Sequence, residues 1–96
     1  MPDIKIIDDR PHSKFYIPID GKKAFIKYRM RNESTIEYIT TFVPEEYRGK
    51  PYARLLVEYA LNYAREKKLR VVPTCPYITK FLSKNEAEYK DIQIEK

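Results

Sequence analysis

From Lys14 to Met30, hydrophobic and polar residues alternate, which is typical of strands that bury one face. The alternation is interrupted once, at Asp20-Gly21, where glycine reaches the positive φ of a tight turn at little cost. These features predict a β-hairpin over this range. Pro18 lies in the first of its two strands and has no backbone N–H, so this strand is expected at the edge of the sheet.

A third strand is predicted from Ser34 to Val43, where β-branched and aromatic residues dominate and Pro44 follows. From Pro51 the period changes to three and four residues, which predicts a helix. Its apolar face comprises Tyr52, Leu55, Leu56, Tyr59, Ala60 and Tyr63.

A short apolar run from Leu69 to Pro73 predicts a fourth strand. A second helix is predicted from Pro76, with a buried stripe formed by Tyr77, Ile78, Phe81 and Leu82.

The order of the predicted elements is β-β-β-α-β-α. A strand, helix and strand in succession form a βαβ unit, so the third and fourth strands are expected to be parallel. The sequence therefore predicts an α+β fold with a mixed β-sheet. Its length of 96 residues predicts a single domain over residues 1–96, with residues 1–12 as a peripheral N-terminal segment.

Charge and cysteine content narrow the function classes. There are 19 lysines and arginines against 14 acidic residues, a net charge of +5, which suits an anionic partner. A single cysteine excludes an intramolecular disulfide and is too few for a zinc site, so we expect a cytoplasmic protein without a metal site. No apolar run has the length of a membrane span, and no membrane partner is expected.

The segment from Arg48 to Arg54 is a candidate phosphate site. It places Gly49 between two cations directly before the first helix, after a strand end. Helix N-termini carry unpaired N–H groups and partial positive charge, and glycine lets the backbone approach a phosphate. The alternative interpretation is a simple turn whose cations face water.

Cys75 is the second candidate. It follows the fourth strand and precedes Pro76, which places it near a helix N-cap, where the dipole can lower the pKa of a thiol. The carboxyl ends of two parallel strands meet at one edge of a sheet, so Cys75 and the Arg48–Arg54 segment are expected to share that edge. The alternative is a buried, inert cysteine. The lone histidine, His12, is expected at the surface.

Two segments resemble the GNAT acetyltransferase superfamily, in particular its compact YjdJ-type branch, over about Phe15 to Ile92. The first follows the pattern T-x-V-P-x-x-x-R-G-x-G-x-A and is matched by Thr41, Val43, Pro44, Arg48, Gly49 and Ala53. The second is a V-x-P-x-C strand end followed by an aromatic helix, matched by Val71, Pro73, Cys75, Pro76 and Tyr77. Tyr89 fits a tyrosine found after the last helix of relatives.

The resemblance implies a minimal GNAT-like fold and an acetyl-CoA-dependent N-acetyltransferase. It places the pyrophosphate of coenzyme A at Arg48, Gly49, Lys50, Pro51, Tyr52, Ala53 and Arg54, and the pantetheine arm along Thr41, Phe42 and Val43. The acceptor would be an amine of a protein, peptide or polyamine, reached through an open site because the chain has few residues before its first strand.

Three positions depart from the family pattern. Pro51 replaces the second glycine and removes one N–H donor from the phosphate site. Tyr52 replaces a small aliphatic residue, and Thr40 stands where relatives often have histidine. These departures put the affinity for coenzyme A and any histidine-assisted chemistry in question.

The candidate catalytic residues are Cys75, Tyr77 and Glu37. Cys75 is the preferred base or transient acetyl carrier, and Tyr77 is a candidate proton donor to the departing thiolate. Glu37 is a candidate base, and regular alternation puts it on the same face of the third strand as Ile39 and Thr41.

Two other functions stay open at this stage. One is a coenzyme A-binding protein with little catalysis. The other is a small basic module that stacks RNA bases on Tyr16, Tyr28 and Tyr38, although no known RNA-binding motif is present and nucleic acid is the less favoured partner.

Overall fold

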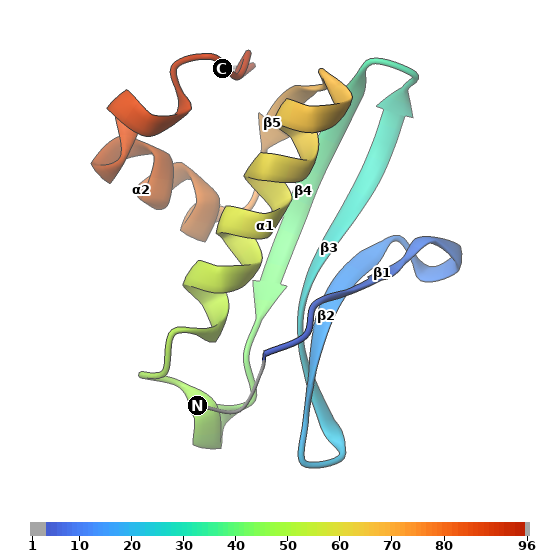
Figure 1. Ribbon diagram of the computed structural model, residues 1–96, viewed down its shortest axis with the longest axis vertical. Coiled ribbons are helices and arrows are strands. Elements are labelled where there is room, and N and C mark those ends of the chain that lie inside the picture. The colour runs from blue at the N-terminus through green and yellow to red at the C-terminus, as the bar shows by residue number, and fades with distance from the viewer. Residues whose placement is uncertain (1–3, 96) are drawn as a thin grey trace.

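The computed structural model describes residues 4–95 and shows a five-stranded mixed sheet with two α-helices (Figure 1). The strands are β1 (Ile7–Asp9), β2 (Lys14–Ile19), β3 (Lys22–Asn32), β4 (Thr35–Phe42) and β5 (Arg70–Pro73), and the helices are α1 (Tyr52–Lys67) and α2 (Pro76–Lys84). Short 3-10 helices are η1 (Arg10–His12), η2 (Glu45–Tyr47) and η3 (Glu86–Tyr89).

The strand order in the sheet is β1-β2-β3-β4-β5. Neighbouring strands are antiparallel except β4 and β5, which are parallel and joined through α1. The predicted fold class, α+β with a mixed sheet, is therefore confirmed.

The β2–β3 hairpin forms around the predicted turn. Asp20 and Gly21 have φ angles of 47° and 79°, so both central residues are left-handed, as a type I′ turn requires. The register pairs Ile17 with Ala24 and Phe15 with Ile26, and all four side chains are buried.

β1 was not predicted, and it occupies the edge of the sheet in place of β2. It pairs antiparallel with β2 from Ile7 opposite Tyr16 to Asp9 opposite Lys14. Pro18 pairs with Lys23 of β3 but lies beyond Tyr16, the last residue of β2 that pairs with β1, so β1 requires no N–H from it. The prediction of β2 as the edge strand was wrong. β1 is short, and its pairing with β2 ends before Pro18, so the proline does not prevent it.

Helix α1 covers one face of the sheet and forms the core with it. In Figure 1, α1 lies over β4 and runs nearly along it. The hydroxyl of Tyr38, a fully buried side chain, donates to the carbonyl of Ala60 at 2.5 Å and ties this face to the helix. The fully buried side chains of α1 are Leu56, Val57, Ala60, Leu61 and Ala64.

Helix α2 and the following segment close the β5 side of the molecule. Ile78 is fully buried, but Tyr77 is 40% exposed, so the predicted buried stripe was wrong at Tyr77. The side chains of neighbouring residues in a helix point about 100° apart. Ile78 points into the core, so Tyr77 points towards the surface. The backbone N–H of Val71 donates to Gln93 at 2.9 Å, which brings the C-terminal segment onto the outer edge of β5. Among residues 4–95, no helix has the length and hydrophobicity of a membrane span.

Candidate functional site

The two parallel strands diverge at the edge of the sheet where the sequence placed a site. β4 pairs with β5 as far as Tyr38 opposite Pro73. β4 then continues to Phe42 with β3 as its only neighbouring strand. Figure 1 shows β4 running well past the end of the shorter β5. Residues 39–42 of β4 thus have no strand partner on the β5 side.

Cys75 lies at this divergence and contacts β4. It is the N-cap of α2, as predicted, and its N–H donates to the Tyr38 carbonyl at 2.9 Å. Its Sγ lies 3.3 Å from the Oγ1 of Thr41. Cys75 is only 2% exposed, while Thr41 is half-buried.

A β-bulge changes the face on which the β4 side chains lie. Lys27 of β3 pairs with Thr40, but the next residue, Tyr28, pairs with Tyr38, so Ile39 is an extra residue in β4. Thr41 therefore lies on the same face as Tyr38.

The expected placement of Glu37 on the face of Thr41 was wrong. Glu37 pairs with Arg29, whereas Thr41 pairs with Ile26, and these two positions of β3 point to opposite faces. Phe42, expected opposite Glu37, shares its face for the same reason. Regular alternation does not predict this bulge, which puts Glu37 and the residue that contacts the Cys75 thiol, Thr41, on opposite faces of β4.

Glu37 is buried in a network of hydrogen bonds on that other face. One carboxylate oxygen accepts from Arg29 Nη2 at 3.0 Å and Arg31 Nε at 3.2 Å, and the Thr74 hydroxyl donates to the other. These donors, first Thr74 and then Arg31, lower the pKa of Glu37 from its ordinary 4.5 to about 2. A carboxylate with so low a pKa is a weak proton acceptor at neutral pH.

Gly49 has the backbone conformation that a phosphate loop needs. Its φ is 89°, a region that L-residues with side chains rarely adopt. An added Cβ would meet no atom within 4 Å, so the space beside this residue is open. Glycine is needed here for its backbone angle and not because a neighbour leaves no room.

Helix α1 begins beside Gly49 with unpaired donors. Pro51 is the N-cap, one residue before the helical turn in which it was expected, and its carbonyl accepts the first helical bond from Leu55 at 3.0 Å. Within residues 4–95, three backbone N–H groups at the helix start have no acceptor, and no acidic residue lies in the first turn; these N–H groups belong to Tyr52, Ala53 and Arg54. This arrangement favours an anion.

The three cations of the loop differ in their roles. Arg48 donates from Nε to the Val43 carbonyl at 3.1 Å, so it shapes the loop. Lys50 and Arg54 are exposed and form no ion pair with any residue from 4 to 95. These two side chains are therefore available to an anionic ligand.

The turn of the β2–β3 hairpin holds η2 in place. The Tyr47 hydroxyl donates to Asp20 at 2.7 Å, and Lys22 pairs with Glu46 at 2.5 Å. The bond to Asp20 is the main cause that raises the pKa of Tyr47 to about 12. Two contacts from a distant hairpin thus fix the start of the loop that carries Gly49.

The remaining predicted residues form no contact with the thiol among the described hydrogen bonds. Tyr77 is in the first turn of α2, exposed, and has no hydrogen bond among the described residues. His12 is exposed and pairs with Asp9 at 3.0 Å, as expected of a surface residue. Tyr28 and Tyr38, two of the three tyrosines considered for base stacking, are buried beneath α1, so that set cannot bind RNA.

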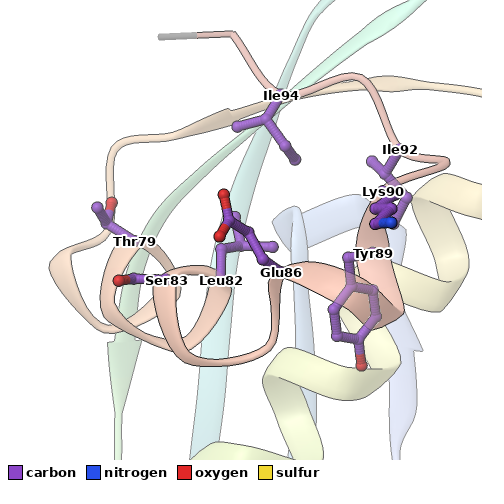
Figure 2. Close-up of a pocket in the computed structure, with 8 residues that line it drawn as sticks. All are labelled: Thr79, Leu82, Ser83, Glu86, Tyr89, Lys90, Ile92 and Ile94. Atoms are coloured by element: carbon purple, nitrogen blue, oxygen red, sulfur yellow. The ribbon is translucent and has the colours of Figure 1, made fainter.

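A separate hollow lies between α2, η3 and the C-terminal segment (Figure 2). Its volume is about 430 Å³, and its lining includes Leu82, Glu86, Tyr89 and Ile94. In Figure 2, Glu86 extends into it from η3. It contains no residue of the loop or of β4, so it is not the predicted site.

Sequence reasoning missed two groups of supporting residues. Thr74, the residue before Cys75, donates to Glu37, and Asp20 with Tyr47 anchors the loop. Thr74 adjoins a predicted site residue and was a detectable signal. The Asp20–Tyr47 contact joins residues 27 apart and has no local pattern.

Comparison with known proteins identifies the family. The family model described as GCN5-related N-acetyltransferase matches residues 14–92. "Protein NATD1" of Danio rerio is 32% identical over 84 residues, covering 85% of this chain and 76% of that protein, and "Protein NATD1" of Homo sapiens is 30% identical, covering 85% and 74%. An NMR structure of a Staphylococcus aureus protein, described as GCN5-like with a proposed N-acetyltransferase activity, matches with a TM-score of 0.71 and 27% identity, covering 97% of this chain and 90% of that one. The chain belongs to the GCN5-related N-acetyltransferase family.

Proposed function

We propose that this chain transfers the acetyl group of acetyl-CoA to an amine. The observation that carries the proposal is the start of α1, where three N–H groups and two cations near Gly49 have no partner among residues 4–95. This anion site lies directly after the unpartnered end of β4. A ligand with a diphosphate and a long polar arm fits both features together.

The residues at both places suit coenzyme A. The backbone of Gly49 and the N–H groups that begin α1 would hold the pyrophosphate, with Lys50 and Arg54 adding charge. Pro51 supplies no N–H, but three donors remain after it. Thr41, Phe42 and Val43 would line the pantetheine arm. Bound there, the cofactor supplies an acetyl thioester, an activated form of the group to be transferred.

Cys75 is the residue that we place at the reacting end. Its thiol is held at the divergence of β4 and β5 by Thr41. As a base it would accept the proton of the attacking amine, and as a carrier it would take the acetyl group first. Tyr77 is exposed near this end of α2 and is proposed as the proton donor to the leaving thiolate.

Glu37 is proposed as a positioning residue in place of the base expected from the sequence. It lies on the opposite face from Thr41 and has a low pKa. Its hydrogen bond from Thr74 acts on the backbone directly before Cys75. Glu37 would therefore orient the thiol without contacting the substrate.

The acceptor is proposed to be an amine of a protein, peptide or polyamine, in the cytoplasm. Thr40 and Phe42 are exposed on the face opposite Thr41, so the open approach to Cys75 is proposed from the family resemblance. A site of this kind does not restrict the size of the acceptor. Membership of the YjdJ-type branch remains a prediction from the motifs.

The proposal is tested by release of free coenzyme A thiol from acetyl-CoA in the presence of a panel of amines, with mass analysis of the acetylated product. We expect turnover with at least one class of primary amine. Tight binding of acetyl-CoA without turnover on any class would instead support a coenzyme A-binding protein with little catalysis.

A further inference from the structure

The sheet has a second face whose side chains are mostly exposed or half-buried, with Thr35 and Glu37 as buried exceptions. Helix α1 packs against β2, β3 and β4 on the face that carries Phe15, Ile26 and Tyr38. The residues between them point the other way. On that open face Lys23, Lys27 and Phe42 are exposed, and Phe42 reaches 43%.

Three aromatic rings form a row across this open face. Tyr16 of β2 pairs directly with Phe25 of β3, and Phe25 pairs directly with Phe42 of β4. Directly paired residues project side by side from the same face. The ring centroids of Phe25 and Phe42 are 5.4 Å apart. The row crosses three strands at one level of the sheet, and none of its rings belongs to the core.

Lysines flank the row on both sides. Lys14 and Lys27 pair with each other one level away, and Lys23 lies on the other side, opposite Pro18. The Nζ of Lys14 lies 5.5 Å from the ring centroid of Phe25, and that of Lys23 lies 4.5 Å from that of Tyr16.

The described part of the chain places no acidic residue opposite Lys23 or Lys27 in the sheet. None of the three lysines forms an ion pair there. Of the acids on the same face, Glu37 is held by Arg29 and Arg31, whereas Asp9 lies opposite Lys14 in the β1–β2 ladder and offsets part of its charge.

We propose that this open face binds single-stranded nucleic acid. Phe42 is exposed, and Tyr16 and Phe25 are half-buried. Aromatic rings of this kind stack on bases regardless of sequence, and Lys14 and Lys23, which lie over two of the rings, would move from the ring faces to bind the phosphates. An acidic polypeptide would satisfy the lysines but would leave the aligned rings without a role. A duplex hides the faces of its bases from the rings. The proposal does not rest on acetyl transfer, although Phe42 at the end of β4 belongs both to the row and to the proposed pantetheine site.

The test is fluorescence anisotropy with a labelled oligonucleotide as single-stranded RNA, as single-stranded DNA of the same sequence, and as duplex. We expect either or both single strands to bind more tightly than the duplex, with an affinity that falls steeply as salt rises. Equal or tighter binding of the duplex, or no binding at low salt, overturns the proposal.

Variants separate stacking from charge. Tyr16→Leu with Phe25→Leu keeps the apolar surface but removes two rings, and we expect a loss of at least tenfold in affinity. Lys23→Ala with Lys27→Ala should reduce the slope of log affinity against log salt by about 2, one for each phosphate contact. The matched control, Lys80→Ala with Lys84→Ala, removes the same charge from the exposed surface of α2.

Three results contradict the proposal. One is unchanged affinity in a ring variant whose circular dichroism shows that it is folded. Another is an equal loss in the α2 control, which would mean unspecific attraction by net charge. The third is displacement by poly-glutamate as effective as displacement by an unlabelled single strand at equal charge concentration.

Discussion

The hydroxyl oxygen of Thr41 and the sulfur of Cys75 lie 3.3 Å apart, although 34 residues separate them in the chain. They meet because β4 and β5 are parallel and because a bulge at Ile39 turns Thr41 to the face of Tyr38. This contact joins the end of β4, where the pantetheine arm is proposed to lie, to the start of α2. It is the geometric basis for placing Cys75 at the reacting end.

Replacing the thiol should affect chemistry more than folding. In Cys75→Ser we expect the turnover number to fall about 100-fold, the lower bound of what a positioned base contributes. The melting temperature should change little, because serine is a favourable N-cap residue. Steady-state kinetics and thermal unfolding measure the two effects.

Thr41→Val is the companion variant, since it removes the hydroxyl that contacts the thiol and keeps the shape of the side chain. We expect a smaller fall in turnover than in Cys75→Ser. Wild-type turnover in Cys75→Ser would show that the thiol takes no part in the reaction. Intact-mass measurement after incubation with acetyl-CoA then distinguishes a carrier, which keeps an acetyl group, from a base.

The Glu37 network should make stability depend on pH in the acidic range. The pKa of Glu37 is lower in the folded state, at about 2, than its ordinary 4.5. Its contribution to stability is therefore present above about pH 4.5 and is lost as the pH falls towards 2. At neutral pH the melting temperature of wild type should be higher than that of Glu37→Gln, and the difference between the two melting temperatures should become smaller below pH 4.5. A difference in melting temperature that stays constant down to pH 2 would contradict a stabilising role of the ionised Glu37 carboxylate.

The same variant tests positioning. Glu37→Gln should lower turnover without shifting the pH–rate profile, and Glu37→Asp should recover part of the loss. If Glu37 were the base, the profile would lose its acidic limb in Glu37→Gln.

The hairpin contact to η2 should influence ligand affinity. Tyr47→Phe removes the hydrogen bond to Asp20 and frees the start of the loop, so we expect acetyl-CoA to bind several-fold more weakly. Tyr52→Phe is the matched control, because the Tyr52 hydroxyl has no hydrogen bond within residues 4–95. Isothermal titration measures the affinity of both variants for acetyl-CoA. Equal affinities would show that the hydrogen bond from Tyr47 to Asp20 does not support ligand binding.

Local patterns in the sequence were sufficient for most of the fold. The Asp20-Gly21 turn, the period of α1 and the crossover between β4 and β5 each depend on residues close together in the chain. Gly49 and Cys75 were found for the same reason, since each adjoins the start of a helix.

The arrangement of side chains across the sheet could not be predicted in this way. The bulge at Ile39 arises from pairing with β3, and without it Glu37 and Thr41 would share a face. Likewise, the tyrosines of β3 and β4 lie under α1, and the exposed aromatic row includes Phe25 and Phe42 instead. Such register effects are tertiary and leave no periodic signal.

Isothermal titration of acetyl-CoA against S-acetylpantetheine, which lacks the pyrophosphate, tests the phosphate loop most directly. We predict that wild type binds acetyl-CoA at least tenfold more tightly and that Gly49→Val abolishes this preference. The control, Lys68→Val, places the same residue at another positive φ, 57°, at the far end of α1 and should retain the preference. Equal affinity of wild type for the two ligands, or an unchanged preference in Gly49→Val, would contradict the proposed site.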